Sequence, residues 1–333
     1  MPDTIEPALK RRLFDLTARL FDGTRSDVET SAEKLVASDS VWHASHPLNT
    51  LQGTEAFLSD FLEPLRAAFP DLERRDHMFI AGTSNGHAWV GGFGLFVGTF
   101  TRDWLGIPAT NRFATVRFGE FRRLENGVIV EGFLLFDLLD LMLQAGVWPL
   151  PKSLGAEAAW TAPMAQHALL LGAQDEHEGQ KTIDLAWAMA GGLLAYDQKS
   201  LASMGQDRFW HPQMTWFGPA GIGTARGLRG FQTHHQVPFL EAFPDRQGGH
   251  HQAAFGEGHY AGWVGWPSVK ATHTGGSWLG LAPTGRPVTM RVMDFYWRDG
   301  DRLRENWVFI DIIDVCRQLG IDLLERMARM KRS

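Results

Sequence analysis

The sequence predicts an α+β fold that occurs twice, as two tandem domains with about three helices each packed on a curved antiparallel sheet. First, the stretch from His273 to Arg286 reappears in degraded form from Thr99 to Arg112, 174 positions earlier. Trp104 and Trp278, for example, are separated by this spacing. Second, each copy starts with helical periodicity and continues with strand-like segments. Third, 333 residues suffice for two domains of about 150 residues. A sheet that curls around its helices leaves a pocket between the two layers.

The repeat sets the expected domain boundaries. Residues 1–148 form copy one, 149–182 a partly helical linker, and 183–333 copy two. The spacing of 174 is expected to hold without a gap from the first strand onward. Matching pairs include Trp42/Trp216, Gly53/Gly227, Phe57/Phe231, Pro64/Pro238, His77/His251, Trp89/Trp263, Glu131/Glu305 and Gln144/Gln318.

Copy one begins with segments that have the apolar period of amphipathic helices. The expected helices cover residues 8–21, 28–37 and 54–68, with a short strand at 40–43 and a loop at 46–53. Segments rich in Phe, Val and Trp follow, separated by turn signals such as Asn85-Gly86. They predict strands at 72–81, 87–101, 113–124 and 128–136. A closing helix is expected at 137–145, with Asp137 as its N-cap.

The linker opens at Pro149-Leu150-Pro151 and contains an Ala-rich stretch, 156–171, that is expected to include a helical piece. A polar run follows, and the repeat then resumes. Copy two is expected to start with a helix at 183–194 and a strand at 214–217.

Composition and charge exclude several classes of protein. The net charge of −6 gives no electrostatic footprint for nucleic acid or for an anionic membrane surface. The single cysteine, Cys316, permits no intrachain disulfide and fits a reducing compartment. No apolar run approaches the length of a membrane span, and the N-terminus lacks an apolar signal core. We therefore expect a cytoplasmic protein. The 13 Trp and 22 Phe residues predict extensive apolar ring surfaces.

The hairpin HTGGSWLGLAPTGR, residues 273–286, and the stretch VTMRVMDFYWRDGDRLRENWVFIDIIDVCRQLG, residues 288–320, resemble the SnoaL-like polyketide cyclase family. This family is part of the larger nuclear transport factor 2-like superfamily of cone-shaped α+β domains. The resemblance covers nearly all of both copies and is closer in copy two. It implies a cone-shaped domain that binds a small molecule, on a fold that hosts cyclases, isomerases, epoxide hydrolases, dehydratases and non-catalytic binding modules.

The resemblance also suggests positions for catalytic side chains. In characterised members an Asp on the last strand is the acid/base of an intramolecular aldol ring closure, and a His on the preceding strand assists. With the QLG ending as the reference, the Asp position falls on Val308 in copy two and Leu134 in copy one. The His position falls on Asp294 and Glu120. Neither copy has the family's Asp, whereas both have a carboxylate at the partner position.

Asp294 and Glu120 each lie within a hydrophobic strand, where a charge needs a polar pocket or a partner. In a pocket, burial would raise the carboxyl pKa toward that of a useful general base. Glu120 is the weaker candidate because Arg122 lies on the same face of its strand. In copy two, His273 or Tyr296 is expected to orient an oxyanion or share a proton with Asp294. The alternatives are an ion-paired carboxylate, a turn-bonded histidine and a core tyrosine.

Further residues are expected to contact a ligand, with structural roles as the alternative. These residues are Glu120, His251, His77, Trp278, Trp263, Val308 and His43. His234-His235 and His250-His251 are adjacent pairs whose side chains diverge on regular structure, so no metal site is expected. Nucleotide-binding glycine motifs and a nucleophile elbow are absent from the sequence. The expected chemistry therefore uses no cofactor.

Two function hypotheses follow. In the first, copy two is a cyclase, isomerase or dehydratase that acts on a hydrophobic carbonyl compound, with Asp294 as base. In the second, the protein is a non-catalytic small-molecule binding module, and copy one is a degenerate partner. An epoxide-hydrolase-like reaction is a variant that needs a second carboxylate. The two copies are expected to pair through their sheet faces as an intrachain pseudo-dimer, which leaves room for further homo-oligomerisation.

Overall fold

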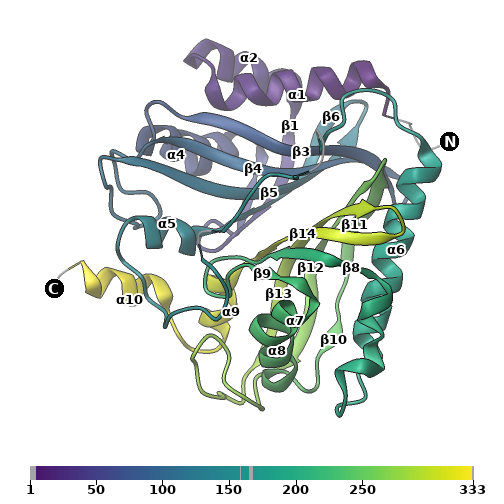
Figure 1. Ribbon diagram of the computed structural model, residues 1–333. Coiled ribbons are helices and arrows are strands. Elements are labelled where there is room, and N and C mark those ends of the chain that lie inside the picture. The colour runs from purple at the N-terminus through teal and green to yellow at the C-terminus, as the bar shows by residue number, and fades with distance from the viewer. Residues whose placement is uncertain (1–4, 158, 165–167, 332–333) are drawn as a thin grey trace. The chain divides into compact units, whose positions relative to one another are not determined.

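The computed structural model describes residues 5–157, 159–164 and 168–331. They fall into two compact units. Unit 1 takes its described residues from Met1–Pro149, His167–Ala173 and Leu324–Ser333, and unit 2 from Leu150–Gln166 and Gln174–Leu323. Each unit holds one seven-stranded sheet and several helices (Figure 1). The predicted α+β fold in two tandem copies is therefore confirmed.

Unit 1 begins with two helices that lie on one face of its sheet (Figure 1). Its helices are α1 (Pro7–Asp22), α2 (Arg25–Leu35), α3 (Gly53–Ala56), the π-helical η1 (Phe57–Leu62), α4 (Glu63–Ala68), α5 (Leu138–Gln144) and most of α10 (Leu323–Met330). Its strands are β1 (Val36–Ala44), β2 (Thr50–Gln52), β3 (Glu73–Ser84), β4 (His87–Thr99), β5 (Phe113–Glu125), β6 (Val128–Phe136) and β7 (Ala168–Leu169). Their order in the sheet is β2-β1-β6-β5-β4-β3-β7, antiparallel except for β1 with β6 and β3 with β7.

The elements of unit 1 form where the residue patterns predict them. Helix α1 buries Leu13, Leu20 and Phe21, the apolar face that its periodicity indicates. A capping box between Thr24 and Asp27 starts α2. Asp137 caps α5 by accepting a hydrogen bond from the Asp140 backbone N–H. The predicted loop at 46–53 contains one short strand, β2, that the sequence did not reveal.

Unit 2 repeats this layout with a longer first helix, α6 (Glu176–Leu194), which packs against β11 and β12. Its other helices are η2 (Leu201–Met204), η3 (Gln206–Arg208), α7 (Gly227–Phe231), the π-helical η4 (Gln232–Gln236), α8 (Val237–Ala242) and α9 (Ile312–Gln318). Its strands are β8 (Trp210–Phe217), β9 (Ala225–Arg226), β10 (Gln247–Gly248), β11 (His251–Glu257), β12 (Tyr260–Thr272), β13 (Pro287–Asp299) and β14 (Arg302–Ile310). The sheet order is β10-β12-β13-β14-β8-β9, with β11 also paired to β12.

The expected helix within 156–171 is wrong for the described residues. Ala156 instead forms a bridge with Thr224 in unit 2, and Ala168–Leu169 adds strand β7 to the edge of β3 in unit 1. Pro163 interrupts this stretch and cannot donate a helical hydrogen bond, which disfavours a helix there. The helix begins only at Glu176, seven residues before the predicted start of copy two at Ile183.

The constant spacing between the copies fails in β12. Trp263 pairs with Asp294, whereas the residue that pairs with the equivalent Glu120 is Gly92, 171 positions before Trp263. An irregularity in the pairing between Gly265 and Val269 restores most of the spacing further along β12. Trp263 is therefore the structural equivalent of Gly92 and not of Trp89.

The same shift separates other residues that the repeat had paired. His251 pairs with Gly265 just before an irregularity in β11, and Asp76 pairs with Gly94 just before the corresponding irregularity in β3. His251 therefore corresponds to Asp76, and the expected equivalence with His77 is wrong. Likewise the His273 N–H donates to the Arg286 carbonyl, as the Phe100 N–H does to that of Arg112. His273 thus replaces Phe100 and not Thr99.

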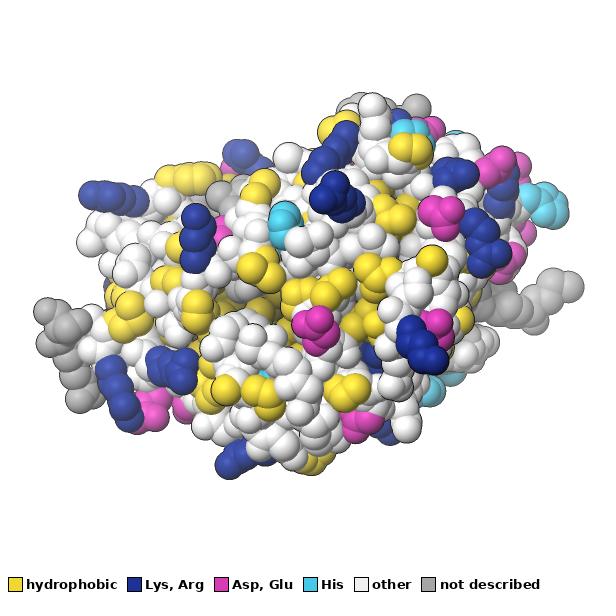
Figure 2. Space-filling view, turned by 60° about the horizontal axis from the view of Figure 1, so that its bottom comes forward, with side chains coloured by type: hydrophobic (Ala, Val, Ile, Leu, Met, Phe, Trp, Pro, Cys, Tyr) yellow, Lys and Arg dark blue, Asp and Glu magenta, His cyan; other side chains and the backbone are white. Residues whose placement is uncertain are grey.

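The face of the molecule drawn in Figure 2 shows mixed charge. On the face drawn in Figure 2, Lys and Arg side chains alternate with Asp and Glu side chains and form no continuous basic patch. Among the described residues, none of the helices combines the length and the apolar character that a membrane-crossing helix requires.

Candidate functional site

The Asp294 carboxylate lies on the helix-covered face of the unit 2 sheet and accepts hydrogen bonds from three side chains. The Trp263 indole N–H donates to Oδ2 at 2.9 Å, and the Tyr296 hydroxyl donates to Oδ1 at 3.2 Å. The Asn306 amide donates to Oδ1 at 3.4 Å. In the strand register Asp294 is opposite both Trp263 and Val308, and Tyr296 is opposite Asn306, so these side chains share one face.

Burial raises the pKa of Asp294 to about 6, although the hydrogen bonds from Asn306, Trp263 and Tyr296 lower it. None of the three donors carries a charge that would offset the cost of burying the carboxylate. Burial also raises the pKa of the Tyr296 hydroxyl well above its usual value. The pair therefore consists of a carboxylate that changes protonation state near neutral pH and a phenol that stays protonated.

Aromatic rings continue this surface toward helix α6. The Trp187 ring is 38% exposed and stacks on Trp263, with 4.7 Å between ring centroids. His251 meets both rings edge-on, at 5.0 and 5.7 Å. Burial lowers the pKa of His251, and the neighbouring His250 adds to this effect. His251 thus lies beside the indole that donates to Asp294, at the margin of the site.

On the opposite side of Asn306 the face is formed by Trp216, its register partner on β8. The His235 ring from η4 stacks on Trp216, with centroids 4.3 Å apart and planes inclined by 12°. Burial lowers the pKa of His235 to about 3, so its imidazole is neutral. Asn306, Trp187 and His235 are site residues that the sequence analysis missed. The sequence did contain one signal for Asn306. Its counterpart in copy one, 174 positions earlier, is Gly132, so copy two has a polar side chain where copy one has none.

The equivalent site in unit 1 is filled by ion pairs. Glu120 contacts Arg74 at 2.5 Å and Arg122 at 2.9 Å, and Arg74 also contacts Asp76 at 2.7 Å. The side chains of Arg74, Glu120 and Arg122 are at most 4% exposed. Burial alone would raise the pKa of Glu120, but Arg122 and Arg74 hold it below its usual value. Glu120 is thus a paired anion at every pH near neutrality.

The shift in β12 explains how two related sheets hold such different sites. In unit 1 the residue opposite Glu120 is Gly92, where a Cβ atom would come within 2.0 Å of the Met78 carbonyl oxygen. In unit 2 the indole of Trp263 stands at that position. A basic side chain, Arg122, is likewise replaced by the Tyr296 phenol. Unit 2 therefore presents neutral donors to its carboxylate where unit 1 presents cations.

Two of the predicted site residues lie at the other end of the unit 2 sheet. His273 is fully buried, its Nε2 lies 3.2 Å from the Gly276 carbonyl, and its ring lies 5.3 Å from that of Phe243. Asp294 is seven residues beyond Pro287, where β13 starts beside His273, which is roughly 20 Å along a strand. The expected proton exchange between His273 and Asp294 is therefore wrong. Trp278 is also buried and packs edge-on against Phe243.

Two further predicted residues are in unit 1, away from Glu120. His43 Nε2 lies 3.2 Å from Glu131, and the His43 ring stacks on Phe133. His77 is half-buried beside Phe93, and burial lowers its pKa. The structure therefore brings together four of the predicted residues, Asp294, Tyr296, Trp263 and Val308, with His251 at their margin.

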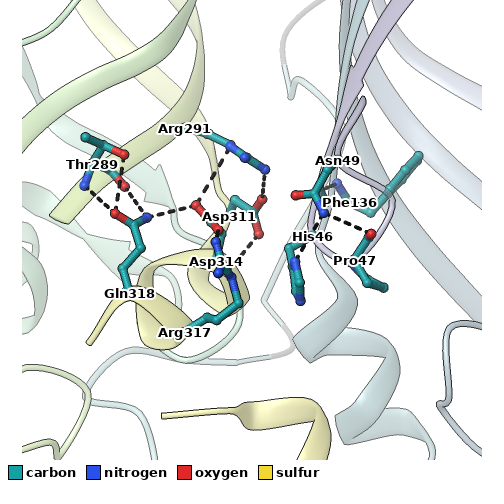
Figure 3. A network of polar contacts seen from close by, with 11 residues as sticks. His46, Pro47, Asn49, Phe136, Thr289, Arg291, Asp311, Asp314, Arg317 and Gln318 are labelled. Carbon is teal, nitrogen blue, oxygen red and sulfur yellow. Dashed lines mark hydrogen bonds and ion pairs between the residues drawn. The ribbon is translucent and has the colours of Figure 1, made fainter. Parts of the chain in front are cut away.

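A separate open hollow of about 480 Å³ lies on unit 2 at the end remote from Asp294. It is lined by Asp245, Gln247, Lys270, Ala271, Thr272, Pro287, Val288, Thr289 and Gln318. Figure 3 shows Gln318 bridging Thr289 and Asp314, and Arg291 reaching Asp311 and Asp314. These polar groups hold α9 to the sheet, and the Asp311 side chain caps the helix by accepting from the Asp314 backbone N–H. We prefer the Asp294 face as the candidate site because its carboxyl group combines burial and a pKa raised to about 6 with neutral hydrogen-bond donors and aromatic walls.

Among the described residues, no group of three or more His, Cys, Asp or Glu side chains is arranged to hold a metal ion.

Comparisons with known proteins identify a family for this chain. The sequence profile of the family described as SnoaL-like polyketide cyclase matches residues 16–145 and 198–319. A putative polyketide cyclase from Streptomyces antibioticus, IdmH, is 22% identical; the match covers 40% of this chain and 97% of that one, with a TM-score of 0.34. A putative hydroxylase from Streptomyces galilaeus, AclR, is 19% identical over 42% and 98% of the chains, with a TM-score of 0.35. No protein with a curated description matches. Because the family profile covers more than half of the chain, once in each copy, this protein belongs to the SnoaL-like polyketide cyclase family.

Proposed function

We propose that unit 2 is an enzyme site for proton transfer without a cofactor, acting on a hydrophobic carbonyl compound with Asp294 as the general base. The observation that carries the proposal is the half-buried carboxylate, with a pKa of about 6 and only neutral hydrogen-bond partners. A base with such a pKa is mostly ionised at neutral pH and still accepts a proton readily. Cyclases, isomerases and dehydratases share this first step.

The strand register supports the assignment. Asp294 is directly opposite Val308 on β14, the position at which the family resemblance implies the acid/base Asp. Side chains that face each other in this way have Cβ atoms about 5 Å apart. A carboxylate at 294 therefore reaches nearly the same region as one at 308, from the adjacent strand.

The neighbouring groups supply the remaining parts of the reaction. Asp294 removes a proton from the carbon next to the substrate carbonyl, and the electron pair moves onto the carbonyl oxygen. Tyr296 stays protonated and, once Asp294 has become neutral, its hydroxyl is available to donate to this oxyanion. The rings of Trp263 and Trp187 provide apolar walls for the substrate.

We assign no acid/base role to Glu120. Two arginines occupy the space around Glu120 and lower its pKa, so the carboxylate is too weak a base to accept a proton from a substrate. Unit 1 then has a structural role, and unit 2 contains the site at which the reaction takes place.

The test is a screen of hydrophobic carbonyl compounds for turnover by the full-length protein, monitored by mass spectrometry and by deuterium uptake from D₂O. With a substrate identified, we expect Asp294→Asn to lower kcat/KM by about 100-fold or more. The wild-type kcat/KM should rise with pH around 6, as Asp294 ionises. Glu120→Gln is the matched change in unit 1 and should leave kcat/KM within a few-fold. Unchanged turnover in Asp294→Asn would refute the base assignment.

The binding-module hypothesis has one observation in its favour. The Asp294 carboxylate already accepts three hydrogen bonds, an arrangement that also suits a fixed polar contact for a bound ligand. In that case ligands would bind in the unit 2 site and be recovered unchanged, with no deuterium exchange. An epoxide-hydrolase-like reaction is disfavoured because the last strand presents Asn306 and Val308, and no second carboxylate, to this face.

A further inference from the structure

Trp263 makes the shortest of the three hydrogen bonds to Asp294. Its indole N–H lies 2.9 Å from the carboxylate, against 3.2 Å for Tyr296 and 3.4 Å for Asn306. An indole N–H donates and never accepts, so it stabilises the carboxylate relative to the neutral acid. This donor is effective only while the ring stays turned toward Oδ2. The groups that fix the orientation of the indole therefore also affect the base.

Three rings surround the Trp263 indole. Trp187 covers one face of it, with centroids 4.7 Å apart and planes inclined by 18°. Tyr296 lies at 4.8 Å with planes inclined by 52°, and His251 meets the indole edge-on. Trp263 is consequently only 5% exposed, whereas Trp187 is 38% exposed and shields it from water. The orientation of the donor thus depends on a residue from another element, helix α6.

Helix α6 is fixed against the sheet before the chain reaches Trp187. Gly179 and Gly256 permit a close approach of the two backbones, because a Cβ atom at Gly179 would lie 2.5 Å from the Gly256 carbonyl oxygen. The Thr182 hydroxyl accepts a hydrogen bond from Arg298 at 2.9 Å. Trp187 follows Gly179 by about two helical turns. The contacts in the first half of α6 therefore set the place of the Trp187 ring.

The Asp294 carboxylate has no cation to keep it ionised, unlike Glu120 with its two arginines. The titratable groups around it are Tyr296 on β13, His251 on β11 beyond the indole, and His235 on η4 at the far end of the face. All three are uncharged at neutral pH, because burial raises the pKa of the tyrosine and lowers the pKa values of both histidines. Neutral donors therefore have to stabilise this anion, and Trp263 has the best geometry among them.

We propose that Trp187 and Trp263 are positioning residues for the base of the unit 2 site: Trp187 fixes the Trp263 indole, and the indole N–H keeps the Asp294 carboxylate oriented and ionised. This inference rests on the proposed function, in which Asp294 is the base. It gives the two tryptophans a role beyond that of apolar walls. Trp187 then acts on the reaction through Trp263 and Asp294, and this role needs no contact between Trp187 and the substrate.

Removing the indole N–H tests the link between Trp263 and Asp294 without a substrate. Trp263→Phe keeps an aromatic ring in the stack and loses the donor. The Asp294 pKa, followed by the ¹³C signal of its carboxyl group in the full-length protein, should rise by about one pH unit, because a hydrogen bond to the charged form is lost. In the wild type the Trp263 indole ¹H–¹⁵N signal should titrate with the same pKa as Asp294. An unchanged or lowered pKa in Trp263→Phe overturns the proposal.

Exchange of the Trp263 indole N–H with D₂O tests the part played by Trp187. Trp187→Leu keeps an apolar side chain on α6 but has no flat face, so the indole N–H should exchange about ten-fold faster than in the wild type. Trp187→Phe can still stack and should restore slow exchange. Leu194→Ala is the matched control, because it changes another exposed apolar residue of α6 and should leave the exchange rate unchanged.

The role of Trp187 is refuted if Trp187→Leu exchanges at the wild-type rate, if Trp187→Phe exchanges as fast as Trp187→Leu, or if Leu194→Ala has the same effect. Trp187 is 38% exposed, so these replacements should leave the fold intact and decide the matter even where Trp263→Phe does not fold. Failure of the proposed function is a separate result. It would appear as unchanged turnover in Asp294→Asn, whatever the pKa of Asp294 and the exchange rates of the tryptophan variants.

Discussion

At the scale of single residues, Asp294 and Glu120 show how neighbours decide the chemistry of a carboxylate. Both are in the middle of equivalent strands, opposite Val308 and Leu134. Neutral donors surround Asp294, and burial dominates its pKa, whereas arginines surround Glu120 and overcome the effect of burial. The two positions therefore call for opposite predictions about stability.

The raised pKa of Asp294 makes stability depend on pH. The folded-state pKa of about 6 exceeds the unfolded value of about 3.9, so the folded state binds this proton more tightly. The resulting stabilisation is complete below pH 4 and is lost as the pH rises to about 6, by roughly 2–3 kcal/mol. Urea unfolding between pH 4 and 8 should show this decline in the wild type and not in Asp294→Asn. Parallel curves for the two proteins would contradict the shift.

Removing the carboxylate in unit 1 should destabilise that unit strongly. Glu120→Ala leaves two buried guanidinium groups without their shared partner, which typically costs about 3–5 kcal/mol. Glu73→Ala provides the control, because the Glu73–Arg75 pair is more than half exposed and should contribute less than about 1 kcal/mol. Denaturant unfolding of both variants checks the difference. Equal, small effects would mean that the buried network contributes no more than a surface pair.

At the scale of elements, strand β12 positions the functional face and helix α9 holds the remote end of the same sheet. The shift in β12 moves Trp263 onto the face that holds Asp294, and a pairing irregularity accommodates it. Helix α9 closes the end of the sheet and is fixed by Asp311, whose side chain accepts from the Asp314 N–H and pairs with Arg291 (Figure 3).

Loss of the α9 cap should be measurable. Asp311→Ala removes both the N-cap hydrogen bond and the ion pair, and we expect a loss of about 1–2 kcal/mol in the free energy of unfolding. Asp311→Asn keeps a capping oxygen and should recover most of it, because Arg291 remains partly exposed to water. Thermal and urea unfolding of the two variants provide the comparison. An Asn variant as unstable as the Ala variant would assign the effect to the ion pair instead.

At the scale of the whole molecule, the two copies have diverged into an ion-paired site and a neutral aromatic one. The expected pairing of the copies through their sheet faces stays a prediction. Small-angle scattering should give the compact profile of a pseudo-dimer, because pairing would bury the apolar outer strands. A profile with two separated lobes would contradict it.

The sequence by itself determined the duplication, the α+β class and the family. The spacing of apolar residues that marks helices and strands is a local property of the sequence, so it can be recognised without the structure. Because the pattern occurs twice, each copy supports the assignment made in the other. It also placed Asp294, Tyr296 and Val308 together, because residues at i and i+2 share a strand face and the turn Gly300 fixes the hairpin register.

Only the tertiary structure decided which of the other candidates belong to the site. A shorter hairpin and a later irregularity in β12 nearly offset each other, so the sequence still reads as a continuous spacing of 174 and could not show that Trp263 replaces Gly92 or that His251 replaces Asp76. Arg74 and His235 reach their sites from β3 and η4, segments distant in sequence from the strands that they meet. Such contacts depend on strand pairing and helix packing, which are non-local, and they set the charge and the polarity of each site.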